Sequence, residues 1–392
     1  MLNGPFSSWP SFSEEEAEKI KQVLLSNKVN YWTGQACRAF EEEFASWVGS
    51  QNAIAVANGT LALDLALKAL DISSGDEVIV TPRTFLASVS SVVTAGATPV
   101  FADVDLNSQN IEAAYIEKVI TPKTKAVIVV HLAGMPAEMD LIMELSEKHG
   151  FYVIEDCAQA HGAKYKGRSV GSIGSVGCWS FCQDKIMTTG GEGGMVACND
   201  KALWEKMWSY KDHGKSWDAI YNRDHPPGFR WLHESFGTNW RMTEMQAAIG
   251  RIQLKRMSAW TEARQGNGAA IDGVARRFSV VRTVDVPKDI EHAEYKHYLF
   301  VRPENLKAEW SRDRIVDEIN ALGVPCFQGS CSEVYLEKAF DDTGWRPKER
   351  LKNAIELGES SLMFLVHPTL TSVEIDKTCV VLSQVLEAAQ KE

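Results

Sequence analysis

Residues 125–156 read KAVIVVHLAGMPAEMDLIMELSEKHGFYVIED, and the fold class can be inferred from this stretch. Lys125–His131 and Phe151–Glu155 are short apolar runs that contain β-branched residues, which is typical of strands buried on both faces. Between them, Met139–Lys148 has apolar residues at helical spacing. A strand, a helix and a second strand in this order predict one βαβ unit of a parallel sheet.

The same alternation extends upstream to Ala53 and continues in altered form beyond Asp156. Three earlier buried strands are predicted at Ala53–Ala57, Glu77–Thr81 and Thr98–Ala102, with helices near Thr60–Leu70, Phe85–Thr94 and Ile111–Val119. Val176–Phe181 and Gly194–Ala197 look like two more strands joined by a loop alone, so we expect part of the sheet to be mixed. The expected fold is therefore α/β, a mainly parallel sheet flanked by helices.

Both ends of the chain depart from this pattern. Ser13 and Glu16 have the spacing of a capping box and open an N-terminal helix. A helical stretch near Thr243–Met257 leads away from the core. Strands and helices then start again at Phe278–Val281, His297–Val301, Ser311–Leu322 and Thr371–Ala389. We therefore expect a large domain over residues 1–255, which includes the N-terminal helix, and a smaller C-terminal α/β domain over residues 256–392. Residues 214–236 have no clear period, and loops that long are uncommon without a function.

Composition limits the class of protein. The 392-residue chain is 45% apolar and 24% charged, which excludes a long disordered chain, a collagen-like repeat and a coiled coil. Lysine and arginine number 41 against 52 acidic residues, so the basic footprint of a nucleic-acid binder is missing in bulk. The N-terminus does not resemble a secretory signal, and the longest apolar stretch is too short to span a membrane. We expect a cytoplasmic protein that binds neither nucleic acid nor membrane.

Eight cysteines raise the question of disulfides. Most of them lie in apolar or small-residue runs, so in a chain of this length we expect reduced, buried thiols. No pair has CxxC spacing and no cysteine–histidine cluster repeats, which disfavours a structural zinc site. The sequence predicts no metal.

Three groups of residues are candidates for chemistry. Asn58-Gly59-Thr60 lies between a strand and a helix, where unpaired N–H groups can bind phosphate, although most such sequences are only helix caps. Asp156 ends a buried strand at the sheet edge where ligands bind, or it is a turn carboxylate. Lys185 stands between an apolar strand and the glycine-rich turn Thr188–Gly194. A Schiff-base lysine needs such a site, and the alternative is a surface lysine on a loop.

A phosphate seat, a carboxylate and a lysine, in this order, fit the chemistry of pyridoxal 5′-phosphate (PLP), because that cofactor needs all three. The order matches the large domain of fold-type I PLP-dependent transferases. The chain also resembles the DegT/DnrJ/EryC1/StrS family of sugar aminotransferases over roughly residues 30–255, with weaker similarity to the end. The matching segments are Phe40–Ala45, Asn58–Leu63, Asp76–Pro82, Thr84-Phe85, Glu155–Gly162, Ser180-Phe181 with Lys185, Gly191–Gly194, and Asn239–Met242 with Glu244, Gln246–Ala248 and Gly250.

The resemblance implies roles for the residues around the cofactor ring. Lys185 would bind the cofactor covalently and later move the proton during catalysis. Asp156 would hold the pyridine nitrogen protonated through an ion pair. Phe85 would stack on the ring, and Gln159 would approach its 3-oxygen side. For each residue the alternative is a packing or capping role.

The resemblance also implies a phosphate site and a partner. Gly59, Thr60 and Ser180 would bind the phosphate group. Asn239 would reach the phosphate of the cofactor in a neighbouring subunit, which makes a homodimer with shared active sites the expected assembly.

The implied activity is transfer of the amino group of L-glutamate onto a nucleotide-linked keto-sugar, with ping-pong kinetics. The preferred substrate is a UDP-linked 2-acetamido-4-keto-6-deoxyhexose, and the product would be a 4-amino sugar for surface polysaccharide or O-antigen. Arg83, Arg230 or Arg241 could pair with the diphosphate.

Some positions depart from the family pattern and leave the sugar open. Ala133 and Met135 stand where the family has a tyrosine and a glutamine, and Cys182 stands where a histidine or aromatic residue is frequent. Phe327–Glu333 replaces a His-Tyr-Pro-like run. A family branch that performs 3-dehydration has histidine in place of the lysine, so Lys185 argues against that branch.

Three alternatives remain open at this point. Within the family, the substrate is a 3-keto sugar or a cyclitol. From another class, the chain is a non-catalytic PLP-fold protein with a binding or regulatory role, which the intact lysine, aspartate and glutamine disfavour. An oxidoreductase is unsupported, because no G-x-G-x-x-G follows any predicted strand.

Overall fold

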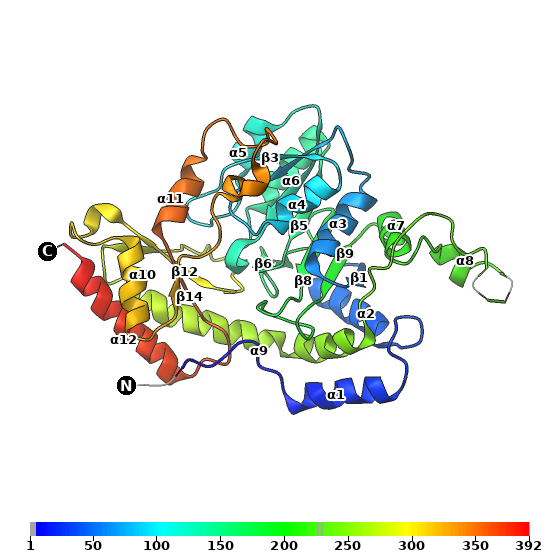
Figure 1. Ribbon diagram of the computed structural model, residues 1–392, viewed down its shortest axis with the longest axis horizontal. Coiled ribbons are helices and arrows are strands. Elements are labelled where there is room, and N and C mark those ends of the chain that lie inside the picture. The colour runs from blue at the N-terminus through cyan, green and yellow to red at the C-terminus, as the bar shows by residue number, and fades with distance from the viewer. Residues whose placement is uncertain (1–4, 226, 229, 392) are drawn as a thin grey trace.

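A seven-stranded sheet is the centre of the larger part of the molecule in the computed structural model, which describes residues 5–225, 227–228 and 230–391 (Figure 1). The strand order is β1-β9-β8-β5-β4-β2-β3. Neighbours from β8 to β3 pair in parallel, whereas β9 is antiparallel to both β8 and β1, so the expected mixed sheet is confirmed. The strands are β1 Asn52–Val56, β2 Glu77–Val80, β3 Thr98–Phe101, β4 Thr124–Val130, β5 Tyr152–Asp156, β8 Val176–Ser180 and β9 Gly194–Cys198.

Strand β4 shows why the central strands are apolar throughout. Ala126, Ile128 and Val130 pack into the core on one face of the sheet, and Val127 and Val129 pack into the core on the other face. Helices cover both faces, as predicted for an α/β fold. One face packs against α2 Ala36–Val48, α3 Gly59–Ala69 and α4 Ala87–Thr94, and the other against α5 Ala113–Val119 and α6 Met139–His149. Helix α1, Glu14–Leu25, begins with the predicted capping box, and α7 spans Lys201–Lys211.

A second, four-stranded antiparallel sheet follows towards the C-terminus, with the order β10-β12-β14-β13. Helices α10 and α12 share its apolar core. The predicted strand at Phe278–Val281 is wrong in its first residues, because the N–H of Phe278 closes the turn that follows α9. These elements are β10 Val281–Thr283, β12 His297–Val301, β13 Cys326–Phe327, β14 Ser361–Phe364, α10 Arg312–Ala321, α11 Lys352–Ser360 and α12 Ser372–Ala389. A small third sheet contains β6 Lys164–Tyr165, β7 Arg168–Ser169 and β11 Ile290–Glu291.

Helix α9, Glu244–Ala275, is 32 residues long and connects the two sheets (Figure 1). The sequence predicted a helix only to Met257. Beyond that residue the buried face carries Arg264 and Gly268 before Ile271 and Ala275, so the apolar pattern is weak although the spacing is helical. The predicted boundary at residue 255 falls inside this helix, so the division into two domains at that point stays a prediction.

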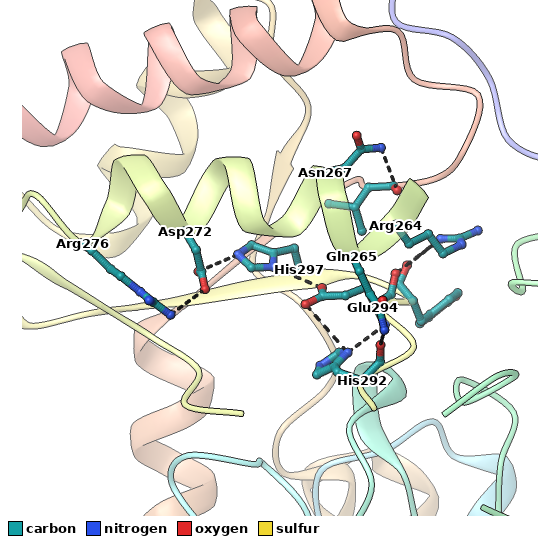
Figure 2. A network of polar contacts seen from close by, with 10 residues as sticks. Arg264, Gln265, Asn267, Asp272, Arg276, His292, Glu294 and His297 are labelled. Atoms are coloured by element: carbon teal, nitrogen blue, oxygen red, sulfur yellow. Dashed lines mark hydrogen bonds and ion pairs between the residues drawn. The ribbon is translucent and has the colours of Figure 1, made fainter. Parts of the chain in front are cut away.

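Polar contacts fix the segment before β12 onto α9 (Figure 2). The His297 ring lies between two carboxylates, with Nε2 3.0 Å from Asp272 and Nδ1 3.1 Å from Glu294. Burial alone would lower the pKa of His297, but these carboxylates raise it to about 10, so the ring is a cation at neutral pH. Gln265 donates to the carbonyl of His292 at 2.9 Å. Residues 292–297 are thereby held in one position against the long helix.

The excursion predicted at residues 214–236 contains a short helix, α8 Trp217–Tyr221, and residues 226 and 229 of this excursion lie outside the described part. Trp217 packs against Trp204 and Trp208 of α7, with ring centres 4.8 and 5.0 Å apart. All eight cysteines are free thiols. No helix in the described part of the chain is long and apolar enough to cross a membrane.

Candidate functional site

A cavity of about 670 Å³ lies at the carboxyl ends of β5 and β8, where ligands of open α/β sheets bind. It brings seven of the eight predicted site residues together. These are Gly59, Thr60, Phe85, Asp156, Gln159, Ser180 and Lys185. The eighth, Asn239, does not line this cavity and is exposed on its own chain.

One end of the cavity is built as a phosphate seat. The Asn58 side chain caps α3 by accepting the N–H of Leu61 at 2.9 Å, so the helix N-terminus opens at Gly59. A Cβ atom on Gly59 would lie 2.5 Å from the Cβ of Ser180, so only glycine lets the helix approach β8 this closely. Helix N–H groups and the Ser180 hydroxyl therefore face one small space, and they fit a phosphate group.

Asp156 is buried and its carboxylate is held from two sides. Its Oδ2 accepts the Ser88 hydroxyl at 2.8 Å, and its Oδ1 accepts the N–H of Ala158 at 3.1 Å. The Ser88 hydroxyl also lies 2.8 Å from that of Thr84. Ser88 was not predicted as a site residue. It lies in the predicted helix Phe85–Thr94, four residues after Thr84 of a segment that matches the family, and this position was a usable signal. An oriented, buried carboxylate fits the pyridine nitrogen of PLP.

Lys185 lies in the turn after β8, and its side chain is only 16% exposed, so the alternative of a surface lysine is wrong. Its Nζ is 4.0 Å from Oδ1 of Asp184 and 5.4 Å from the centre of the Tyr295 ring. The Tyr295 hydroxyl donates to the other carboxylate oxygen of Asp184. The indole N–H of Trp9 donates to the Lys185 carbonyl at 2.8 Å and fixes the turn. The structure thus presents one primary amine to the cavity.

Gln159 and Phe85 flank the space between the carboxylate and the lysine. The side-chain oxygen of Gln159 accepts the N–H of Ala133 at 2.7 Å, which leaves its amide nitrogen as the donor for a ligand. Ala133 has a φ of 57° and also accepts the N–H of Tyr295, so this turn joins the cavity wall to the segment before β12. The Phe85 ring is 72% exposed and lines the cavity.

A second cavity of about 650 Å³ adjoins the first, because both are lined by Thr84, Phe85, Gln159, Asp184 and Lys185. Apart from Leu86, its remaining wall comes from the C-terminal half of the chain, and of this wall the sequence pointed only to the segment Phe327–Glu333. The wall includes Tyr295, Lys296, Tyr298, Phe327, Gly329, Ser330 and Cys331. The segment that departs from the family pattern at Phe327–Glu333 therefore contributes to this second cavity.

Two of the three arginines suggested for a diphosphate have other partners within this chain. Arg83 is fully buried and donates to the side chain of Gln109 at 2.9 and 3.1 Å and to the Ser330 carbonyl at 3.3 Å. Arg241 pairs with the buried Asp212 at 2.7 Å. Arg230 is exposed but lines neither cavity. Arg83 instead fixes the segment at Ser330, and the cation in the second cavity beside Lys185 is Lys296.

His131, Glu155 and Cys157 are close enough to share a metal ion. Glu155, however, accepts the Nε2–H of His131 at 3.0 Å and the N–H groups of Gly171, Ile173 and Gly174 at 2.6 to 2.8 Å. Burial raises the pKa of Glu155, and its bonds with His131 and these N–H groups outweigh that effect and lower it. Both carboxylate oxygens of Glu155 already accept two hydrogen bonds each, which leaves neither of them for a metal ion. The role of these bonds is to hold the segment between β5 and β8 in place.

The DegT/DnrJ/EryC1/StrS aminotransferase family matches residues 10–383. The chain is 39% identical over 352 residues to the GDP-perosamine synthase of Caulobacter vibrioides, with 88% of this chain and 89% of that protein covered. It is 45% identical over 241 residues to the UDP-N-acetyl-3-dehydro-alpha-D-glucosamine 3-aminotransferase of Acidithiobacillus ferrooxidans, with 62% of each covered.

Among solved structures, the aminotransferase from Psychrobacter cryohalolentis is 63% identical and superposes with a TM-score of 0.96, covering 98% of this chain and 99% of that one. The similarity therefore extends over both sheets and both cavities. The resemblance that the motifs indicated is confirmed, and the chain belongs to the DegT/DnrJ/EryC1/StrS aminotransferase family as a PLP-dependent sugar aminotransferase.

Proposed function

We propose that the enzyme moves the amino group of L-glutamate onto a nucleotide-linked keto-sugar. The preferred substrate is UDP-2-acetamido-4-keto-6-deoxyhexose, and the product is a 4-amino sugar for surface polysaccharide. The observation that carries this proposal is the gathering of a phosphate seat, Asp156 and Lys185 around one cavity, with a second cavity adjoining at the lysine. The first cavity suits PLP, and the second has room for a sugar.

PLP, when bound, supplies an electron-withdrawing ring that carries the amino group from donor to acceptor. Asp156 holds a proton at the pyridine nitrogen, and the bond from Ser88 keeps its carboxylate oriented. The Lys185 amine takes and returns the proton at the substrate carbon. Gly59 and Ser180 position the phosphate group, and Phe85 covers the ring. Glutamate leaves as 2-oxoglutarate before the keto-sugar reacts, which gives ping-pong kinetics.

A 3-keto sugar is the second candidate substrate. The similarity to the 3-aminotransferase of Acidithiobacillus ferrooxidans favours it. The choice between the two lies with the residues at Phe327–Cys331, which line the second cavity from the C-terminal side. A panel of nucleotide-linked 3-keto and 4-keto sugars, scored for aminated product by mass spectrometry, decides between them.

The cofactor and donor are tested without any sugar. Purified enzyme incubated with PLP is expected to be yellow, and its absorption band is expected to shift when L-glutamate is added. Lys185→Ala is expected to be colourless, whereas Lys201→Ala, at an exposed position on α7, should keep the band. A wild-type protein without a band refutes the PLP role, and a band that ignores glutamate refutes the donor.

The working unit in this proposal is a cytoplasmic homodimer in which Asn239 of one subunit reaches the cofactor phosphate of the other. Asn239 is exposed, and the neighbouring Phe236 and Trp231 are 100% and 82% exposed, as expected of a surface that a partner covers. The free thiols suit a reducing compartment.

Mixed dimers test the shared site. Lys185→Ala and Asn239→Ala are each expected to be inactive. A heterodimer of the two has one site with both changes and one intact site, so statistical mixing should restore about a quarter of the wild-type activity. A mixture that stays inactive, or an Asn239→Ala enzyme that is fully active, refutes the shared site.

A further inference from the structure

Lys296 lines the second cavity and has no anionic partner in the described part of the chain. No described residue forms a hydrogen bond or an ion pair with its amine, whose nearest recorded neighbour is the Tyr295 ring, with its centre 5.0 Å away. The Lys185 amine lies 5.4 Å from the centre of the same ring. Two lysine amines therefore lie near one aromatic side chain, and both belong to the wall of one cavity.

The carboxylates nearby do not neutralise this pair. Asp184 accepts the Tyr295 hydroxyl with one oxygen and lies 4.0 Å from Lys185 with the other. Glu337 also lines the cavity, but it is exposed, where solvent screens its charge. Lys296 is left as a cation that still lacks a counter-ion.

The surroundings of Lys296 add positive charge. Burial and the nearby cations Arg264 and Lys185 together lower the pKa of Lys296 to about 8, and the Asp184 carboxylate only partly opposes them. Arg264 itself is buried, and its Nε and one Nη have no hydrogen-bond partner in the described structure. Such a site stabilises an anion that enters the cavity.

We propose that Lys296 binds a carboxylate of the amino donor, an inference that rests on the proposed use of L-glutamate. The donor's carboxylates lie one and three bonds from the carbon that loses the amine, so they come close to Lys185 when that carbon reacts. In a nucleotide sugar the diphosphate is separated from the reacting carbon by the sugar ring. A cation that shares an aromatic neighbour with Lys185 therefore matches the donor better than the diphosphate.

The position of Lys296 is built into the fold. The segment from His292 to His297 is fixed on α9 by the contacts of His297 and Gln265 (Figure 2). The N–H of Tyr295 donates to the carbonyl of Ala133, whose own N–H is bonded to Gln159 in the wall of the first cavity. The Lys296 amine therefore belongs to a segment that is held in place by hydrogen bonds. Such a segment favours a binding subsite that is already formed before the ligand arrives.

Calorimetric titration of the PLP-loaded enzyme with glutarate, a dicarboxylate without an amino group, tests this subsite apart from turnover. Lys296→Gln is expected to weaken glutarate binding about tenfold to a hundredfold, because it removes a charge-assisted hydrogen bond. Lys296→Arg should retain most of the affinity, and Lys348→Gln, at an exposed position, should equal the wild type. UDP binding should be unchanged in all three variants.

Unchanged glutarate binding by Lys296→Gln overturns the inference, and so does a loss of UDP affinity without a loss of glutarate affinity. The glutamate-induced shift of the absorption band separates this failure from that of the proposed function. If the wild type shows the shift and Lys296→Gln needs no more glutamate than the wild type, only the subsite is wrong. If the wild type shows no shift, glutamate is not the donor and both proposals fall.

Discussion

Replacing Glu155 by glutamine changes one oxygen to an NH₂ group in a side chain surrounded only by donors. One carboxylate oxygen accepts the N–H groups of Ile173 and Gly174 at 2.8 and 2.6 Å. The other accepts the N–H of Gly171 at 2.6 Å and Nε2 of His131 at 3.0 Å. The other nitrogen of His131 accepts a backbone N–H, so Nε2 must carry the proton.

The size of the effect follows from this count. In either orientation of the glutamine amide, the NH₂ group faces two buried donors and accepts from neither. Each unsatisfied buried donor costs about 1–3 kcal/mol, so Glu155→Gln should cost roughly 2–6 kcal/mol of local stability. The loss falls on residues 171–174, which lead into β8 and hence to Ser180 and Lys185 in the site.

Hydrogen exchange measured by mass spectrometry on peptides covering residues 170–176 is the suitable assay, because it reports local opening rather than global unfolding. Glu155→Gln should expose these amides to exchange at least about tenfold faster, since each 1.4 kcal/mol is a factor of ten. Glu147→Gln, an equivalent change at an exposed position on α6, should leave them unchanged. Equal protection in Glu155→Gln and the wild type would refute the hydrogen-bond reasoning.

Three further changes probe other parts of the molecule. Gly59→Ala puts a Cβ atom 2.5 Å from that of Ser180, which is too close for the helix to keep its position. The dissociation constant for PLP, measured by titrating the apoenzyme, should therefore rise at least about tenfold. An unchanged constant contradicts the phosphate seat. Asp212→Ala leaves the largely buried Arg241 guanidinium without its carboxylate, and urea unfolding should show a loss of about 3–5 kcal/mol, whereas a loss under 1 kcal/mol contradicts the ion pair. The pKa of His297 is raised to about 10, so its stabilising contribution is complete below the ordinary value near 6.5 and is lost as the pH rises from there to about 10. Unfolding titrations across that range should show a decline in the wild type that His297→Gln lacks, and parallel curves would count against it.

The central sheet and the first cavity were predictable from the sequence because their signals are local. A strand that ends in Asp156, and a strand followed by Gly59 and a helix, each identify a site residue within a few positions, and the sheet rule brings the strand ends together. The second cavity was not predictable in this way. Tyr295 meets Asp184 across 111 residues of sequence, and neither lies in a pattern that points to the other.

The length of helix α9 was predicted too short for a different physical reason. Its second half is buried through Arg264, which donates to backbone carbonyls, and through Gly268, so burial there is not accompanied by apolar residues. Hydrophobic periodicity reports buried apolar side chains, and it cannot report a helix face that is buried by polar contacts.

The length of α9 also fixes the relative direction and separation of two side chains that anchor it to the rest of the molecule. Near one end Gln253 accepts the N–H of Thr188 at 2.9 Å in the turn after Lys185, and near the other Asp272 binds His297. These anchors are about 28 Å apart along the helix axis. One inserted residue would rotate the far anchor by about 100°, and four would nearly restore its direction but displace it by about 6 Å. A small insertion therefore cannot keep both the direction of the far anchor and its distance from the near one. The length of α9 thus sets how far the second sheet lies from the turn that contains the reactive lysine.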